Sequence, residues 1–247
     1  GCALPFGRRI FRTVKGHAAR RAARDARQNE EFARLCGEAC AAGRAQKDCT
    51  LSAKRAGLFG TLCALPFAAA SAVLYVFFAP RVLLATGSLF FEPLLLAAAL
   101  LALVPLHEGV HARASAAVHR SFYGIRLRVL GTPQCVCLRF ANRAQYAVSA
   151  LAPFVLLGLA PAAAGIATGC LPALVCGAFG CIAAGADLLV AFLALRAGKG
   201  AVLLDHPARC GFAAFSPKCG GAENSFAQEV DKTCSIEYNK KRKHGGK

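Results

Sequence analysis

Charged residues, and acidic ones above all, are scarce in this sequence. Only 17% of the 247 residues are charged, 13 are Asp or Glu, and 56% are hydrophobic, whereas a soluble domain is normally about a quarter charged. This composition argues against an ordinary soluble domain and indicates a membrane protein. Several apolar stretches exceed the roughly 18 residues that cross a bilayer. We expect four membrane spans, at residues 57–79, 88–111, 146–168 and 172–195.

Positive charge, in contrast, is abundant, with 30 Lys and Arg and a formal net charge of +17. In a soluble protein this excess would indicate nucleic-acid binding. Here 13 of these residues lie in 1–56, 6 in 112–145 and 10 from 196 onward, which is the pattern of the positive-inside rule. We therefore expect cytoplasmic termini and a cytoplasmic 112–145 segment, external loops near 80–87 and 169–171, contacts with membrane lipid, and no nucleic-acid partner.

The charge pattern divides the chain into three parts. Residues 1–56 are predicted to be a basic cytoplasmic helical leader, residues 57–198 a four-span membrane core, and residues 199–247 a polar basic cytoplasmic tail. Between spans two and three, residues 122–140 alternate apolar side chains with Arg and contain a Gly and Pro turn, a pattern typical of a β-hairpin. The expected fold is an all-α integral membrane protein with about four transmembrane helices and this small cytoplasmic hairpin.

The chain also lacks the paired CxxC spacing of a zinc ribbon, although it has 13 Cys. An odd number excludes complete pairing within one chain, and membrane or cytoplasmic segments keep their thiols reduced. Two groups invite a metal-site interpretation: Cys36, Cys40 and Cys49 in the leader, and Cys135 with Cys137 in the hairpin. We interpret both groups as small apolar side chains instead.

A short motif at the end of the predicted second span carries the chemistry. His107 and His111 are four residues apart, so on a helix they face the same way and can bind one zinc ion, with Glu108 beside them to accept a proton from water. Zinc lowers the pKa of a bound water to roughly 7, and a carboxylate can carry that proton to a leaving amine. Ionisable side chains at membrane depth are functional by default. The alternative is that this motif only marks where the span meets the cytoplasm.

A catalytic zinc site needs a third protein ligand. A further His six residues after the motif is excluded because Ala117 stands there, and no Glu occurs between Glu108 and Glu223. Asp187 lies inside the fourth span, where an unpaired carboxylate is strongly disfavoured. Asp187 is therefore the expected third ligand.

Three other residues stay open as the third ligand: His119, Asp205 and His206. His119 follows the motif closely in a basic segment, so a surface position is its alternative. Asp205 and His206 precede Pro207 in a polar segment, which makes a turn cap equally compatible with their sequence.

Polar residues around the hairpin offer substrate contacts. The hairpin edge can accept an extended substrate strand, because proteolysis needs a segment that is not helical. Asn142 and Gln145, just before span three, are candidates for hydrogen bonds to a substrate backbone or an oxyanion, or are ordinary interface residues. We interpret four basic residues as lipid-facing charges rather than substrate contacts: Arg126, Arg128, Arg139 and Arg143.

Several motifs follow one another between about Leu94 and Gly211. They are the HExxH at 107–111, the hairpin-like segment, Ala152 and Pro153 near the start of a span, Gly185 with Asp187, and the DHP triplet at 205–207. This order resembles the membrane family labelled putative zincin peptidase, which is similar in layout to the site-2 proteases. The resemblance implies a membrane peptidase whose zinc is held by the two His and an Asp. In site-2 proteases that Asp precedes Gly and follows an NxxP segment, whereas here Leu188 follows Asp187 and NxxP is absent.

The leading hypothesis is a four-span membrane zinc endopeptidase that cleaves a membrane-associated protein or peptide. A second hypothesis keeps the fold but makes the chain a non-catalytic scaffold or regulator with a structural or vestigial metal site. A small transporter with Asp187 in a proton or metal relay ranks last, because the sequence shows no inverted repeat. We expect a multi-pass protein of a prokaryotic plasma membrane, with both termini cytoplasmic.

Overall fold

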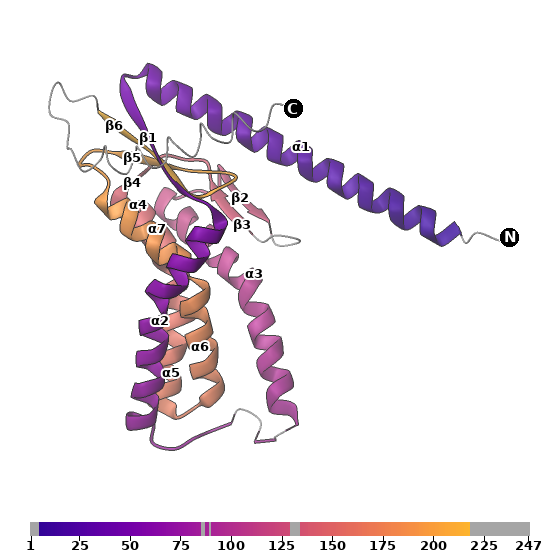
Figure 1. The fold of residues 1–247 in the computed structure, drawn as a ribbon, viewed down its shortest axis with the longest axis vertical. Helices are drawn as coiled ribbons and strands as arrows, with labels where there is room; N and C mark the ends of the chain where they lie inside the picture. Colours follow the sequence, from indigo (N-terminus) through magenta and orange to yellow (C-terminus); the bar gives the residue numbers. More distant parts are fainter. Residues whose placement is uncertain (1–4, 85–86, 89, 129–133, 218–247) are drawn as a thin grey trace. The chain divides into compact units, whose positions relative to one another are not determined.

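The computed structural model of the chain describes residues 5–84, 87–88, 90–128 and 134–217 (Figure 1). The chain divides into two units, Gly1–Ser216 and Pro217–Lys247, and the elements below belong to the first. Three predicted features lie partly or wholly outside the described residues: the tail from 218 onward, the hairpin turn at 129–133, and the loop near 85–86 and 89.

Long apolar helices dominate the fold. Three are long and apolar enough to cross a membrane: α2 (Ala53–Phe78), α3 (Phe91–His119) and the run Arg143–Thr168. A fourth candidate is the pair α6 (Leu171–Ala183) and α7 (Gly185–Arg196), which bends by 49° at its break. Many outward side chains on these helices are apolar, such as Val76 and Leu101 with 79% and 74% of their surface exposed. An apolar surface of this kind is compatible with a multi-pass membrane protein.

The second span is longer than predicted. We expected it to end at residue 111, but α3 continues to His119 and ends at Arg120, whose backbone is left-handed with φ of 51°. The HExxH motif therefore lies inside the helix, about two turns before its C-terminus. This continuation keeps both histidines on rigid helical backbone.

The third span is interrupted by proline. It consists of α4 (Arg143–Pro153), the π-helical turn η1 (Phe154–Leu159) and α5 (Ala160–Thr168). Pro153 ends α4 and Pro161 lies in the first turn of α5. Because Pro has no N–H to donate, the helical hydrogen bonds change register around it, and a wider π turn is a common result.

A small sheet corrects the expectation of an all-α fold. Four strands form it in the order β1-β6-β5-β4: β1 (Arg44–Leu51), β6 (Cys210–Pro217), β5 (Val202–Asp205) and β4 (Ala141–Asn142). The last three pair antiparallel. Two further strands between spans two and three, β2 (Ile125–Arg128) and β3 (Gln134–Cys137), form a separate antiparallel pair. The fold is thus mostly helical with two small sheets.

The two faces of the larger sheet pack against different helices. Leu203, Phe212 and Ala214 pack against Val190 and Ala194 of α7. The alternate side chains cover the other face, where α1 (Pro5–Ala41) packs against them. This second cluster contains Cys36, Ala39, Leu204, Ala213 and Phe215. Side chains that alternate between two buried faces follow from the two-residue period of a strand.

The sheet is built from segments that the sequence analysis assigned to the leader and to the tail. In the leader, α1 ends at Ala41 and β1 follows, instead of helix up to residue 56. In the tail, residues 202–217 form β5 and β6, with Phe212 and Phe215 fully buried. Figure 1 shows the strands gathered at the end of the helices where α2 and α4 begin.

The two loops predicted to be external lie together at the opposite end of the helices. Leu83 forms a parallel bridge with Cys170, and its N–H donates to the carbonyl of Gly169 at 2.7 Å. The hydroxyl of Tyr75 donates to the same carbonyl at 2.6 Å. The two loops thus lie at the same end of the helices.

Candidate metal centre

The two histidines of the HExxH motif come from one face of α3. His107 and His111 are one helical turn apart, and their ring centroids are separated by 4.8 Å. Both side chains are mostly buried, with 16% of each exposed. The helix therefore presents two ring nitrogens to one point, as the spacing predicted.

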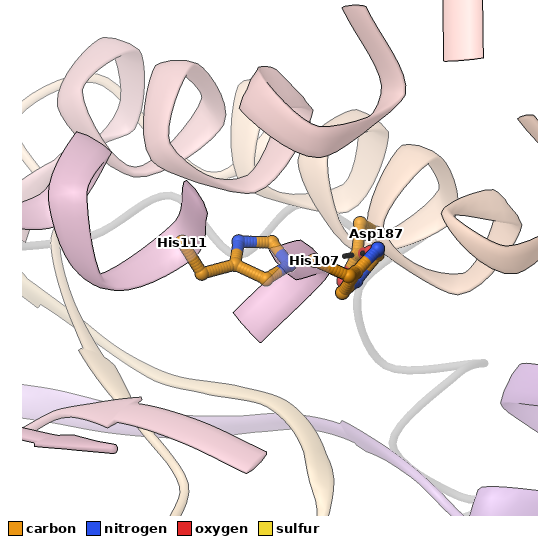
Figure 2. A group of neighbouring side chains, drawn as sticks. All are labelled: His107, His111 and Asp187. Atoms are coloured by element: carbon orange, nitrogen blue, oxygen red, sulfur yellow. Dashed lines mark ion pairs between the residues drawn. The ribbon is translucent and has the colours of Figure 1, made fainter. Parts of the chain in front are cut away.

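The break between α6 and α7 brings Asp187 to the same point. Asp187 is in the first turn of α7, just after the non-helical Ala184. Its Oδ2 lies 3.0 Å from Nε2 of His107 and 3.3 Å from Nε2 of His111 (Figure 2). The three ligand atoms all lie within 4.8 Å of one another, and this trio is the metal-capable group found among the described residues.

The donor set fits zinc. Two imidazole nitrogens and one carboxylate oxygen are a known catalytic ligand set, which leaves one coordination position open. Tetrahedral bonds of about 2.0–2.1 Å place ligand atoms roughly 3.3 Å apart. The two separations from Asp187, 3.0 and 3.3 Å, agree with that, and all three atoms lie within 4.8 Å of one another. Only small side-chain movements would therefore be needed to hold the ion.

A backbone carbonyl orients the second histidine. Nδ1 of His111 lies 3.0 Å from the carbonyl oxygen of Ser149 in α4. Because a carbonyl only accepts, Nδ1 carries a hydrogen, and Nε2 is the nitrogen that would bind the ion. Metal-binding histidines commonly use their other nitrogen in this way.

Glu108 lines a cavity of about 440 Å³ together with the metal-capable trio. The cavity lies between the helices, β3 and the turn between β5 and β6. Within the described part of the chain, no hydrogen bond or ion pair engages the Glu108 carboxylate. It is therefore available to a water molecule or a substrate in the cavity.

The three alternative ligands, His119, Asp205 and His206, also line this cavity, and the last two have other partners. Asp205 accepts hydrogen bonds from the Tyr146 hydroxyl at 2.8 Å and from the Cys137 N–H at 3.1 Å. Nδ1 of His206 accepts from the backbone N–H groups of Ala208 and Arg209, both at 3.1 Å, so His206 caps a turn. None of the three belongs to the metal-capable trio found among the described residues.

Burial has a clear effect on Asp205. It raises the pKa of this carboxyl to about 6, against the two hydrogen bonds that favour the charged form. The same environment raises the pKa of the Cys137 thiol to about 11, so this thiol is protonated at neutral pH. Asp205 thus connects β3 to α4 as a buried acceptor.

Asn142 and Gln145, candidates either for substrate contacts or for ordinary interface residues, have a structural role in the fold. The two residues form a reciprocal capping box at the start of α4: the Asn142 side chain accepts from the Gln145 N–H at 2.9 Å, and the Gln145 side chain accepts from the Asn142 N–H at 3.0 Å. This pairing satisfies backbone donors at a helix N-terminus. Both side chains therefore support the helix that carries Ser149.

Three of the four arginines interpreted as lipid-facing make contacts within the protein instead: Arg126, Arg139 and Arg143. Arg126 lies 3.4 Å from Glu31 of α1. Arg139 donates to the carbonyl of His119, and Arg143 donates to the carbonyls of Leu195 and Ala197 at the end of α7. A cation at a helix C-terminus is favourable, so Arg143 helps to fix α4 against α7.

Sequence reasoning missed two residues that support the site, Ser149 and Tyr146. Ser149 acts through its carbonyl, which no side-chain motif reveals. Its position four residues before Pro153 is a signal, because Pro leaves that carbonyl without its helical donor. Tyr146 carries no comparable signal, since its partner Asp205 comes from a distant strand.

The helices and the converging side chains define a mostly helical protein with three or four candidate membrane spans and a group able to hold a metal ion. Residues 100–202, from the middle of α3 to the start of β5, match the model of a family described as putative zincin peptidase. This match confirms the resemblance inferred from the sequence motifs, and its segment contains the metal-capable trio. No curated protein and no solved structure matches the chain.

Proposed function

We propose that this chain is a membrane-embedded zinc metalloendopeptidase that hydrolyses peptide bonds of membrane-associated substrates. Its ligands would be His107, His111 and Asp187, and Glu108 would act as general base and then as general acid. The observation that carries the proposal is the convergence of the three ligand atoms in the cavity that Glu108 lines. The family match supports a metallopeptidase.

The residues of the cavity have distinct tasks in this mechanism. When bound, zinc acidifies a water molecule and polarises the scissile carbonyl. Glu108 accepts the proton of that water and then donates it to the leaving amine. Asp187 supplies negative charge between the two imidazoles and holds both Nε2 atoms toward the open part of the cavity.

A second hollow supports a membrane-associated substrate. It measures about 240 Å³ and lies between α3, η1 and α6, with Leu103, Val104, Leu157 and Phe179 among its apolar walls. His107 and Glu108 also line it, so the apolar hollow and the polar cavity meet at the catalytic motif. An apolar substrate segment could occupy the hollow while its peptide bond reaches the cavity. The distribution of Lys and Arg supports a cytoplasmic side for this site.

The edge of β3 supports binding of an extended substrate segment. The N–H of Leu138 donates to the carbonyl of Gly124 at 2.9 Å. From this pair onward, successive residues of β3 alternate between backbone groups that bond to β2 and backbone groups that face away from it. Cys135 and Cys137 then direct their N–H and C=O groups away from β2. Cys137 uses its N–H for Asp205, whereas Cys135 is a lining residue of the cavity.

Substitution Cys135→Pro tests this edge. It removes one outward N–H without removing a bond to β2, because that N–H does not face β2. We expect KM for an extended peptide reporter to rise about tenfold, the effect of losing one backbone hydrogen bond, with zinc content unchanged. Cys135→Ala is the control for the loss of the thiol and should behave as the wild type. An unchanged KM in Cys135→Pro would exclude the edge as a substrate site.

The general-base role is tested with Glu108→Gln. The purified proteins are reconstituted in liposomes with a reporter that joins one apolar membrane segment to an extended cytoplasmic segment. We expect the variant to retain zinc, because Glu108 is not a ligand, and to cleave at least about a hundredfold more slowly. Zinc is measured by elemental analysis and cleavage by electrophoresis.

The outcomes of this experiment separate the functional classes. Cleavage that survives in Glu108→Gln would rule out Glu108 as the base. Zinc in the wild type without cleavage of any reporter would favour a non-catalytic scaffold or regulator with a structural metal. Absence of zinc from the wild type would contradict the metal centre itself.

A further inference from the structure

Pro153 lies four residues after Ser149 at the end of α4, and it is fully buried. In an uninterrupted α-helix, the N–H of residue 153 would donate to the carbonyl of residue 149. Proline has no N–H, so this donor is missing. The next N–H, that of Phe154, donates to Leu151 instead. The Ser149 carbonyl is thus left without a donor from its own helix.

This same carbonyl accepts the hydrogen bond from His111. The distance between its oxygen and Nδ1 of His111 is 3.0 Å. A buried carbonyl without a partner is costly, and a helical carbonyl with its partner in place would offer only one remaining lone pair. The imidazole of His111, on α3, therefore supplies the donor that the Ser149 carbonyl lacks within α4.

We infer that Pro153 is a positioning residue for the metal centre: by withholding its N–H, it reserves the Ser149 carbonyl for His111. The hydrogen bond keeps a hydrogen on Nδ1 of His111, so that Nε2 is the nitrogen that would bind the ion. It also fixes the ring so that Nε2 lies beside Oδ2 of Asp187. The inference rests on the proposed role of His111 as a ligand, but not on peptide hydrolysis.

A second proline in the same helical run, Pro161, also removes a helical donor, but from a carbonyl that does not face a histidine. Pro161 leaves the carbonyl of Leu157 without its donor in the same way. That carbonyl faces Gly180 of α6, where an added Cβ would lie only 2.0 Å from its oxygen. It lies against another helix and not against an imidazole. Pro161→Ala therefore serves as the control for Pro153→Ala within the same helical run.

The test compares Pro153→Ala with Pro161→Ala in the full-length protein. Ala is the better helix former, so the helical fold is not at risk. In Pro153→Ala the new N–H competes for the Ser149 carbonyl, and we expect zinc affinity to fall by about 10- to 100-fold, as for other residues behind a metal ligand. Pro161→Ala should bind zinc within about threefold of the wild type. Zinc affinity is measured by competition with a chromophoric chelator.

A spectroscopic measurement separates positioning from a general loss of stability. In the zinc-loaded protein with ¹⁵N-labelled histidine, we expect the Nδ1–H proton of His111 to resonate far downfield in the wild type and in Pro161→Ala, as a hydrogen-bonded proton does. In Pro153→Ala this signal should move upfield, because the new N–H competes for the Ser149 carbonyl. Equal zinc affinity in the two variants, or an unchanged Nδ1–H signal of His111 in Pro153→Ala, would overturn the inference.

The results remain distinct from a failure of the proposed function. A wild type that binds zinc but cleaves no reporter would refute the peptidase, while the difference in affinity between the two variants would still support the role of Pro153. A wild type that binds no zinc would overturn the metal centre and the positioning role together.

Discussion

Replacing Asp187 by Ala is expected to leave the purified protein without zinc and without detectable cleavage. Asp187 is the group that joins the two histidines, at 3.0 and 3.3 Å from their Nε2 atoms. If the roughly 10–16 kcal/mol of a four-ligand zinc site is shared equally, one ligand contributes about 3–4 kcal/mol, or roughly a hundredfold to a thousandfold in affinity. Cleavage falls further, because the metal itself is lost. Zinc content and reporter cleavage are measured on the same samples.

The matched control for this prediction is Asp205→Ala. Both carboxylates line the cavity, but Asp205 is bonded to Tyr146 and Cys137 rather than to the histidines. We expect Asp205→Ala to retain its zinc. Loss of zinc from Asp205→Ala, with zinc retained in Asp187→Ala, would show that Asp205 and not Asp187 is the third ligand.

The local part of the site could be predicted from the sequence because its geometry is set by one helix. The spacing of His107 and His111 fixes their relation on any α-helix. Asp187 could be predicted as the third ligand by elimination, because an unpaired carboxylate among apolar residues is strongly disfavoured. The four apolar stretches likewise fixed the candidate spans within a few residues, except where α3 continues past the motif.

The remaining features depend on contacts between distant segments. The larger sheet joins residues 44–51 to 210–217, and neither segment shows by itself which strand it will pair with. Short strands that are buried on both faces also lack the alternation of polar and apolar residues that marks a half-exposed strand. The role of Asn142 was missed for a related reason, because a capping residue and a substrate-binding residue have the same chemistry.

The bend between α6 and α7 is also a long-range feature, since α2 packs directly against it. Gly60 of α2 meets the backbone of Gly185 and Ala186 so closely that a Cβ at position 60 would lie 2.4 Å from the Ala186 nitrogen. A Cβ on Gly185 would lie 2.3 Å from the Gly60 carbonyl oxygen. Two glycines thus allow two helical backbones to touch, directly before Asp187 in the chain.

Substitution Gly60→Val is therefore expected to disable the metal centre from a distance. Normal contacts between carbon atoms are about 3.5–4.0 Å, so α2 and α7 must separate by roughly 1 Å, and Asp187 moves with α7. A displacement of this size can reduce an enzymatic rate by roughly a hundredfold. We expect cleavage to fall by at least that factor, and zinc affinity to fall with it, while circular dichroism shows an unchanged helix content.

The matched control is Gly57→Val, on the same helix, where an added Cβ would meet nothing within 4 Å. This variant carries the same change of residue and should retain both zinc and cleavage. If Gly60→Val bound zinc as tightly as Gly57→Val, the contact between α2 and α7 would not determine the position of Asp187. A loss confined to Gly60→Val would show that the third ligand is held in place by a helix that contributes no side chain to the trio.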